Sequence, residues 1–303
     1  MQRRKINRQK CICCNKITIN NITGIPGYLF CDACELGWIK HMPHTSYKAH
    51  YYQAQSSLAH TLFKPITLFV YLIRTLYLRR GTKELWIDVG AGDGDFLRTV
   101  DAKRKIGVEI SFAARKRMRS AQIHAITPNT FLREKTFHAD VISFWHVLEH
   151  VNDPIQYLVA SKNNLKQNGK LIIGVPNNNS IEFKIFKNRW FHLALKFHHW
   201  HFSISSLQKL LSSTGFKTDK IDYWSIEHHL TGILQSCINS TSSSPDILHK
   251  LVKRKTDHSL LRIQDLLSIT FWLTLGLPFV LILWIFGSLL RRPGTFVVVA
   301  SKR

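Results

Sequence analysis

The chain has 303 residues, 45% hydrophobic and 20% charged, so wholesale disorder is excluded, and a core domain of about 150–200 residues with smaller attachments is expected. Its 42 basic residues outnumber 19 acidic ones, and the net charge of +23 indicates an anionic partner, either nucleic acid or an acidic membrane surface. The first ten residues are basic with no apolar run after them, so we expect no secretory signal peptide.

Two pairs of cysteines follow this basic start. Cys11 and Cys14 form one C-x-x-C pair, and Cys31 and Cys34 form a second, separated from the first by sixteen residues. Four thiolates at this spacing predict tetrahedral zinc in a small ribbon; the alternatives are four unrelated buried cysteines or a disulfide pair. Cys13 is a spare thiol that could replace a neighbour as ligand. A closed site of this kind predicts a structural metal.

The segment between the ribbon and the core is polar and aromatic at His41–Gln55 and apolar at Leu58–Leu78. Lys64, Pro65 and Arg74 interrupt the apolar part, which disfavours a spanning helix. We expect one or two helices packed beside the core.

A glycine-rich turn follows the first core strand. The stretch Leu85–Leu97 reads as a strand, a turn and the start of a helix, with glycines at positions 90, 92 and 94. Nineteen residues after Gly90, a second strand ends in Glu109. This is the layout of a nucleoside-binding βαβ unit, in which the acid accepts hydrogen bonds from two ribose hydroxyls.

The charge of this turn bears on which nucleoside binds. A dinucleotide site has G-x-G-x-x-G and leaves a helix N-terminus free for pyrophosphate. Here the spacing is G-x-G-x-G, and Asp88, Asp93 and Asp95 repel phosphate and suit a positively charged ligand. S-adenosylmethionine carries a sulfonium, an ammonium and no phosphate. The stretch resembles motif I of class I S-adenosylmethionine-dependent methyltransferases.

Strands and helices alternate from this turn onward, as expected of a parallel sheet. The predicted helices are Phe112–Ala121 and Ile155–Leu165, and the predicted third to seventh strands are Ile123–Ile126, Ala139–Phe144, Lys170–Pro176, Thr218–Ile226 and Gly294–Lys302.

Two phrases in this region strengthen the resemblance. His146–Pro154 reads HVLEHVNDP and Asn168–Asn177 reads NGKLIIGVPN, similar to signatures of the branch that includes ubiquinone-pathway O-methyltransferases. The resemblance covers about residues 84–225 and the last ten residues. It implies an α/β, Rossmann-like sheet in the order 3-2-1-4-5-7-6, in which the last strand is antiparallel beside the fifth.

The resemblance also implies S-adenosylmethionine as the cofactor. The residues expected to bind it are Asp88, Gly90, Ala91, Gly92, Gly94, Glu109, Ile110, Asn129 and His146. Asn129 stands in a loop that lacks the acid which commonly receives the adenine amino group. The fourth strand ends in FWHVLEH rather than N/D-P-P-Y, which favours oxygen or carbon acceptors over amino nitrogens.

Histidines cluster in residues 196–203, KFHHWHFS. The segment resembles part of the same branch; in related sugar methyltransferases a histidine five residues before this serine acts as general base, and that position is His198. The catalytic candidates are His198, His201 and His146. A neutral imidazole is a suitable proton acceptor, worth about 10²–10⁴ in rate. The alternative is that these histidines order a lid and that catalysis works by positioning alone.

Leu266–Leu290 contains 25 residues without a charge, long enough for a membrane helix. A single crossing, however, would separate the final strand from its sheet. Pro278, just after Gly276, divides the run into halves of about 12 residues and about 18 Å each. We therefore predict a monotopic helical hairpin between the sixth and seventh strands; the alternative is a hairpin buried against Leu58–Leu78 or in a dimer.

Basic residues at the approaches to this run could each contribute about 1 kcal/mol on an anionic leaflet. They are Lys250, Lys253, Arg254, Lys255, Arg262, Arg291 and Arg292.

The expected organisation has five parts: a basic tail and zinc ribbon (1–45), a helical linker (46–80), the methyltransferase core (81–226), an insertion with the hydrophobic hairpin (227–292), and the last core strand (293–303).

The leading functional hypothesis is a methyltransferase on the cytoplasmic face of a membrane, acting on a lipid-linked sugar or glycan precursor. A prenylated quinone ring is an alternative acceptor. An RNA methyltransferase with a zinc ribbon is a second hypothesis, disfavoured because the basic residues gather around an apolar run without an aromatic-studded platform. A non-catalytic scaffold is a third, and the intact glycines and Glu109 argue against it.

Overall fold

The structure, a computed structural model, describes residues 9–18, 25, 27–39, 58–78, 81–225, 228–252 and 262–303. Three sequence-predicted features lie outside these residues: most of the basic tail, the His41–Gln55 segment, and the basic residues 253–255.

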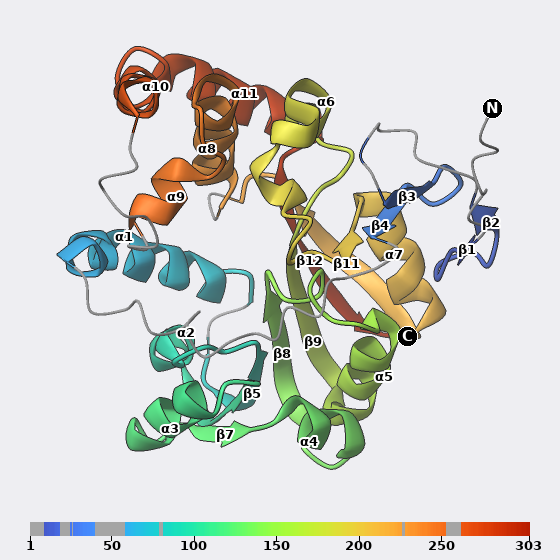
Figure 1. The fold of residues 1–303 in the computed structure, drawn as a ribbon. Coiled ribbons are helices and arrows are strands. Elements are labelled where there is room, and N and C mark those ends of the chain that lie inside the picture. The colour runs from blue at the N-terminus through green and yellow to red at the C-terminus, as the bar shows by residue number, and fades with distance from the viewer. Residues whose placement is uncertain are drawn as a thin grey trace.

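Seven strands form the central sheet (Figure 1). They are β5 (Lys83–Val89), β6 (Ala102–Val108), β7 (His124–Ile126), β8 (Ala139–Trp145), β9 (Leu165–Pro176), β11 (Phe216–Asp222) and β12 (Thr295–Lys302). The order across the sheet is β7-β6-β5-β8-β9-β12-β11, which is 3-2-1-4-5-7-6 when β5 is counted as the first strand. The strands from β7 to β9 pair in parallel, and β12 lies antiparallel between β9 and β11.

Both faces of this sheet are buried. Successive side chains of a strand point to opposite faces, so Trp86 and Val297 belong to one apolar cluster while their neighbours Ile87 and Val298 belong to another. Strands covered on both sides need continuous apolar runs, which explains why β8 and β12 lack polar alternation.

Helices cover both faces of the sheet (Figure 1). On one side lie α1 (Leu58–Thr75), α2 (Asp95–Thr99) and α3 (Phe112–Ser120), and on the other α4 (Pro128–Arg133), α5 (Pro154–Asn164) and α7 (Ile204–Ser213). Four of these helices begin at a side chain that accepts a hydrogen bond from a first-turn N–H: Ser111, Thr127, Asp153 and Ser203.

The apolar run forms two helices, α10 (Ile263–Leu273) and α11 (Leu277–Leu289), between β11 and β12 in the chain. The break falls at Gly276 and Pro278, where it was predicted, but the helices meet at 61°, so the chain bends there without reversing into the expected hairpin. In the described part of the chain no single helix is long and apolar enough to cross a membrane; this bent pair together meets that length and composition.

The pair packs on its inner side against α6 (Ile181–Phe186) and α8 (His229–Thr241), and α9 (Ile247–Val252) follows α8. Val280 and Leu283 of α11 form a small apolar cluster with Ile233 and Cys237 of α8. The single-turn 3₁₀ helices Lys187–Arg189 and Phe191–Leu193 complete this half of the molecule.

The ribbon contains β1 (Gln9–Lys10), β2 (Ile17–Thr18), β3 (Tyr28–Cys31) and β4 (Leu36–Ile39). A two-residue strand from the core, β10 (Trp200–His201), pairs with β4 and makes a three-stranded sheet with the ribbon. A Cβ at Gly37 would lie 1.9 Å from the Tyr28 hydroxyl, so only glycine fits there. The ribbon is thus joined by backbone hydrogen bonds to the histidine segment.

Several boundaries differ in detail from the sequence expectation. Strand β9 begins at Leu165 rather than Lys170, and β11 begins at Phe216 and ends at Asp222. The apolar segment from Leu58 is one helix despite the internal Pro65.

Candidate active site and metal-binding cluster

The turn after β5 packs directly against the segment after β8. Gly90, Gly92 and Gly94 have φ angles of 76°, 54° and 79°, in the region that favours glycine. A Cβ at Gly90 would lie 2.3 Å from Cγ2 of Val147. Position 90 therefore needs glycine both for its backbone conformation and for the close approach of Val147, which follows His146.

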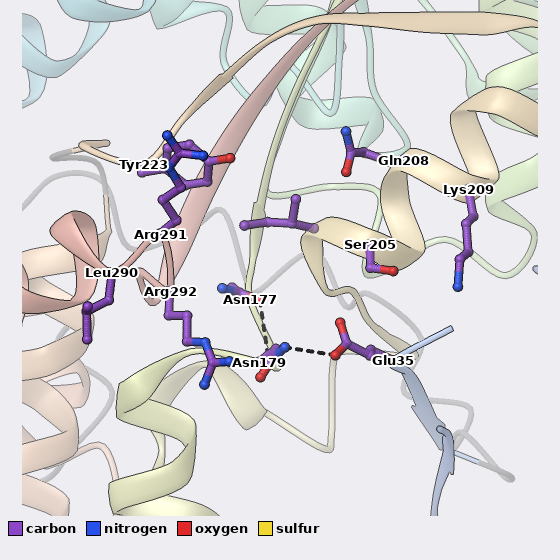
Figure 2. Close-up of a pocket in the computed structure, with 11 residues that line it drawn as sticks. Glu35, Asn177, Asn179, Ser205, Gln208, Lys209, Tyr223, Leu290, Arg291 and Arg292 are labelled. Atoms are coloured by element: carbon purple, nitrogen blue, oxygen red, sulfur yellow. Dashed lines mark hydrogen bonds between the residues drawn. The ribbon is translucent and has the colours of Figure 1, made fainter. Parts of the chain in front are cut away.

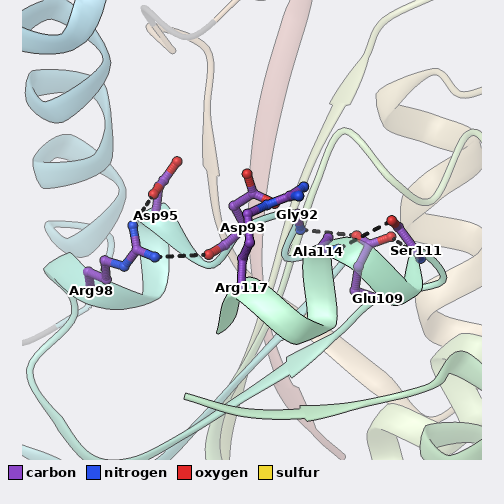
Figure 3. Close-up of polar contacts among 8 residues, drawn as sticks. All are labelled: Gly92, Asp93, Asp95, Arg98, Glu109, Ser111, Ala114 and Arg117. Atoms are coloured by element: carbon purple, nitrogen blue, oxygen red, sulfur yellow. Dashed lines mark hydrogen bonds and ion pairs between the residues drawn. The ribbon is translucent and has the colours of Figure 1, made fainter. Parts of the chain in front are cut away.

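Glu109 follows β6 and holds the glycine turn in place (Figure 3). Its Oε2 accepts a hydrogen bond from the Gly92 N–H at 3.0 Å, and its Oε1 accepts one from the Ser111 N–H at 2.8 Å. Glu109 is 2% exposed, and an ionised carboxylate has about four lone-pair sites in all. Ile110 beside it is 63% exposed and offers an apolar surface next to that position.

Two of the three acids in the turn are paired with arginines (Figure 3). Asp93 Oδ1 accepts a hydrogen bond from Arg117 Nε at 2.8 Å, and Arg98 Nη1 lies 2.5 Å from Asp95 Oδ1. The negative charge expected there from the sequence is therefore largely neutralised by arginines of α2 and α3.

Asp88, at the end of β5, is the third acid and is 4% exposed. Its Oδ1 accepts a hydrogen bond from the Ser143 hydroxyl at 2.6 Å. Burial raises the pKa of Asp88 to about 7, although the Ser143 hydrogen bond and the positive charge of Arg74 both act to lower it. Arg74, from α1, is buried with its guanidinium carbon 4.6 Å from the Trp145 ring centroid. Helix α1 thus supplies a cation beneath the turn.

The segment after β8 carries His146 and Glu149. His146 has a φ of 56°, unusual for a side chain of this size, and its Nδ1 lies 3.5 Å from Glu149 Oε1. Glu149 is 1% exposed, and neither of its carboxylate oxygens has a hydrogen-bond partner among the described residues. Burial raises the pKa of Glu149 to about 7, and it lowers the pKa of His146 to about 3.

His198 lies beside this carboxylate. Single side-chain N or O atoms of Glu149, His150 and His198 all lie within 4.8 Å of one another, an arrangement that could also hold a cation. His198 Nδ1 is 2.8 Å from the backbone carbonyl oxygen of His192, so Nδ1 carries the proton and Nε2 keeps its lone pair. Burial holds the pKa of His198 well below its usual value, and the ring is therefore neutral at pH 7.

The other two predicted polar side chains have different surroundings. His201 Nε2 donates to the Leu193 carbonyl oxygen at 2.7 Å, and its ring packs 5.0 Å from that of Tyr28 in the ribbon. Its environment is the junction between ribbon and core. Asn129 is exposed in the first turn of α4, after β7.

The four predicted cysteine ligands come together. One Sγ each from Cys11, Cys14, Cys31 and Cys34 lies within 4.8 Å of the others, a set that could hold a metal ion. Cys13 points elsewhere: its Sγ donates to the Ser206 carbonyl oxygen of α7 at 3.7 Å. The spare thiol therefore bridges the ribbon to the core and is not part of the set.

Sequence reasoning missed three residues of this site. Glu149 is a buried acid among histidines, and its position in the HVLEH phrase was the available signal. Arg74 and Arg117 lie on other helices, and nothing local in the sequence connects them to the turn.

A family model described as "Methyltransferase domain" matches residues 59–221, more than half of the chain. A solved S-adenosylmethionine-dependent methyltransferase of Archaeoglobus fulgidus is 16% identical, with a TM-score of 0.46 over 81% of this chain and 100% of that one. One of Mesorhizobium loti is 14% identical, with a TM-score of 0.44 over 82% and 100%. No curated protein matches the chain.

Proposed function

The chain belongs to the family described by that methyltransferase-domain model and is an S-adenosylmethionine-dependent methyltransferase; we propose that it methylates an oxygen or carbon of an acceptor held at a membrane surface. The acceptor we favour is a lipid-linked sugar or glycan precursor. A prenylated quinone ring is the alternative within the same class of membrane-held hydroxyl or ring-carbon acceptors.

The residues around the glycine turn fit the cofactor. Glu109 is placed to accept hydrogen bonds from the two ribose hydroxyls, and Ile110 offers an apolar face for adenine. Position 90 needs glycine because a Cβ there would collide with Val147. When bound, S-adenosylmethionine supplies a methyl group made electrophilic by its sulfonium. Asp88, once ionised, is the acid placed to balance the positive charge of the ligand.

We assign proton removal from the acceptor to His198. A hydroxyl must lose its proton as a methyl group arrives, and the neutral imidazole with a free Nε2 can take it. Glu149 lies beside His198 and can stabilise the imidazolium formed, because an ionised carboxylate next to the ring favours its charged form. His146, 3.5 Å from the same carboxylate, is a positioning residue.

The observation that carries the membrane proposal is the outer surface of α10 and α11. Fourteen large apolar side chains between Ile263 and Leu290 are exposed there, from 41% to 78%. Monomeric soluble proteins rarely expose a contiguous apolar surface of this extent. If the bent pair lies in the headgroup region of a bilayer, lipid covers this surface. The strand β12 then stays on the same side of the bilayer as its sheet.

We further propose that the four-cysteine cluster binds a structural zinc ion. Four thiolates at this spacing suit tetrahedral coordination, and the cluster has no carboxylate or open position for chemistry. Thiolate ligands persist in a reducing compartment, which supports the cytoplasmic face of the membrane.

The experiment that tests this function compares cells with and without the protein after supplying labelled S-adenosylmethionine. We expect label to appear in the lipid or glycan fraction only when the protein is present. Label that appears instead in RNA would overturn the proposed acceptor class while leaving the methyltransferase activity intact. The His198→Ala variant serves as the low-activity control.

A further inference from the structure

A cavity of about 410 Å³ opens where the ribbon, α7 and the end of α11 meet (Figure 2). Its wall includes Glu35 of the ribbon, Ser205 and Gln208 of α7, and Arg291 and Arg292 after α11. Ligand sites in proteins typically have volumes of about 300–1,000 Å³, so this cavity is large enough for a small charged group. None of the residues in its wall belongs to the glycine turn or the histidine cluster.

The cavity wall is rich in positive charge. It carries three basic side chains, Lys209, Arg291 and Arg292, against one acid, Glu35, a net charge of +2. Lys209 Nζ already donates to the Ala33 carbonyl oxygen. The guanidinium of Arg292 has no hydrogen-bond or ion-pair partner among the residues that the structure describes. The guanidinium carbon of Arg291 lies 5.8 Å from the centroid of the Tyr223 ring.

The backbone holds these arginines in position. Arg291 has a φ of 56° at the end of α11, where glycine is the usual residue. The Arg292 N–H donates to the Gly287 carbonyl oxygen at 2.7 Å, and its own carbonyl oxygen accepts from the Ile181 N–H at 3.2 Å. The backbone of both arginines is therefore fixed at the cavity wall, from which the side chain of Arg291 extends toward Tyr223 and that of Arg292 toward Asn179 (Figure 2).

Neutral donors from another helix face the same space. The Ser205 hydroxyl and the Gln208 amide have no side-chain partner among the described residues, and both lie in the first half of α7. Arginine binds phosphate with two parallel hydrogen bonds, and hydroxyl and amide donors complete such sites. One oxygen of Glu35 is occupied, because its Oε1 accepts a hydrogen bond from Asn179 Nδ2 at 3.0 Å (Figure 2).

We propose that this cavity binds the phosphate or diphosphate group of a lipid-linked acceptor. The proposal rests on the membrane function proposed above and specifies its substrate class. Leu290 lines the cavity and is the last exposed apolar residue of the α10–α11 pair, so a lipid chain leaving the phosphate meets that apolar surface.

The sheet places the cavity at a usable distance from the cofactor turn. Both lie at the edge where the parallel strands end: Gly90 follows β5, Asn177 follows β9 and Tyr223 follows β11. Neighbouring strands are about 4.8 Å apart, so β9 is about 10 Å and β11 about 19 Å from β5 across the sheet. The phosphate and the group to be methylated are therefore expected to lie about 10–19 Å apart on the acceptor.

The test uses the full chain and three probes: inorganic pyrophosphate, phosphatidylcholine vesicles containing a polyprenyl diphosphate, and phosphatidylcholine vesicles of equal charge containing phosphatidylglycerol. We expect pyrophosphate binding, and about tenfold tighter binding to the polyprenyl diphosphate vesicles than to the phosphatidylglycerol vesicles. Equal binding to both vesicles, together with no pyrophosphate binding, would identify the arginines as a general contact for anionic headgroups and overturn the proposal.

Substitutions in α7 and the ribbon separate the cavity from the membrane surface. Gln208→Glu adds a carboxylate to the cavity and is expected to abolish the preference for diphosphate. Gln167→Glu, at an exposed site near the start of β9, is expected to leave that preference unchanged. Glu35→Gln keeps an acceptor for Asn179, removes the negative charge, and is expected to strengthen pyrophosphate binding severalfold. Equal effects of Gln208→Glu and Gln167→Glu would contradict the assignment.

The arginines are tested with a matched loss of charge. One double variant combines Arg291→Ala and Arg292→Ala. The control combines Arg104→Ala and Lys217→Ala, which removes two exposed charges near the start of β6 and β11. Only the first pair is expected to lose pyrophosphate binding. If no vesicle is bound but pyrophosphate binding depends on the cavity residues, the membrane function fails and the phosphate site stands. If the native protein and every variant bind vesicles without a preference for diphosphate, the membrane function stands and the phosphate site fails.

Discussion

The Nδ1 atom of His198 lies 2.8 Å from the backbone carbonyl oxygen of His192, which fixes the tautomer of the ring and leaves Nε2 as its basic atom. This is the tautomer that a general base requires. We expect His198→Ala to lower turnover by about 10²–10⁴ while changing the dissociation constant of S-adenosylmethionine little. Methyl transfer into the membrane fraction and equilibrium cofactor binding measure the two effects. His124→Ala, at an exposed site, is the control, and unchanged turnover of His198→Ala would refute the role.

Cofactor affinity should depend on Glu109. Its carboxylate holds the Gly92 N–H and is placed to receive the ribose hydroxyls, and hydrogen bonds to charged groups contribute about 1.5–3 kcal/mol. We expect Glu109→Ala to weaken cofactor binding by about 10- to 100-fold, measured by calorimetry. Glu134→Ala, an exposed acid at the end of α4, should leave affinity unchanged. A similar loss in both variants would point to a general electrostatic effect.

The stability of the cofactor-free protein should depend on pH through Asp88. Burial raises its pKa to about 7 from 3.8, so the folded state holds the proton more tightly than the unfolded state. The stability that the protonated Asp88 carboxyl gives the folded state is fully present below about pH 4, and it is lost as pH rises through 7. Asp88→Asn cannot ionise, and its free energy of unfolding should therefore rise relative to the native protein by about 1.4 kcal/mol per pH unit within this window. Urea unfolding at pH 5 and 7 measures the difference.

A matched acid controls for surface charge in that experiment. Asp101→Asn, at an exposed site, should give a difference from the native protein that does not change with pH. The same flat result for Asp88→Asn would show that its carboxyl is ionised at pH 5.

Metal binding should require Cys31 but not Cys13. Cys31 belongs to the four-thiol cluster, whereas Cys13 is bonded to Ser206. We expect one zinc ion per chain by elemental analysis, its loss in Cys31→Ser and its retention in Cys13→Ser. Because β4 pairs with β10, metal loss should also lower turnover more than cofactor affinity. Equal zinc in both variants would overturn the ligand set.

Membrane attachment should survive high salt and depend on the apolar helix pair. Leu267 and Ile282 are 66% and 60% exposed, and burying a charge in their place would oppose insertion. We expect Leu267→Glu with Ile282→Glu to shift the protein into the soluble fraction by about tenfold, equivalent to about 1.4 kcal/mol. Val159→Glu, which replaces an apolar residue 42% exposed on α5, should not. Release of the native protein by salt alone would argue against insertion.

The sheet was predictable because each of its strands carries a local signature. The strand–turn–helix at Gly90, the acid at Glu109 and the buried runs of β8 and β9 each identify an element without reference to the others. The closing strand could be placed beside β9 because the resemblance to class I methyltransferases implies that position. The spacing of the four cysteines likewise predicts that they share one site.

The relationships that sequence could not provide are those between distant short segments. β10 has two residues, too few for a recognisable strand pattern, and it becomes a strand only because β4 presents an edge to it. Arg74 enters the site from α1, where it reads as an interruption of an apolar helix. The 61° bend depends on how α11 packs on α8, so Gly276 and Pro278 could locate the break but not its angle.

The position of β12 has a consequence for how the molecule is made. This strand lies between β9 and β11 in the sheet, yet it follows the apolar helix pair in the chain. During synthesis, α10 and α11 therefore leave the ribosome while β9 and β11 still lack the strand that joins them. Closure of the sheet therefore follows synthesis of the α10–α11 pair.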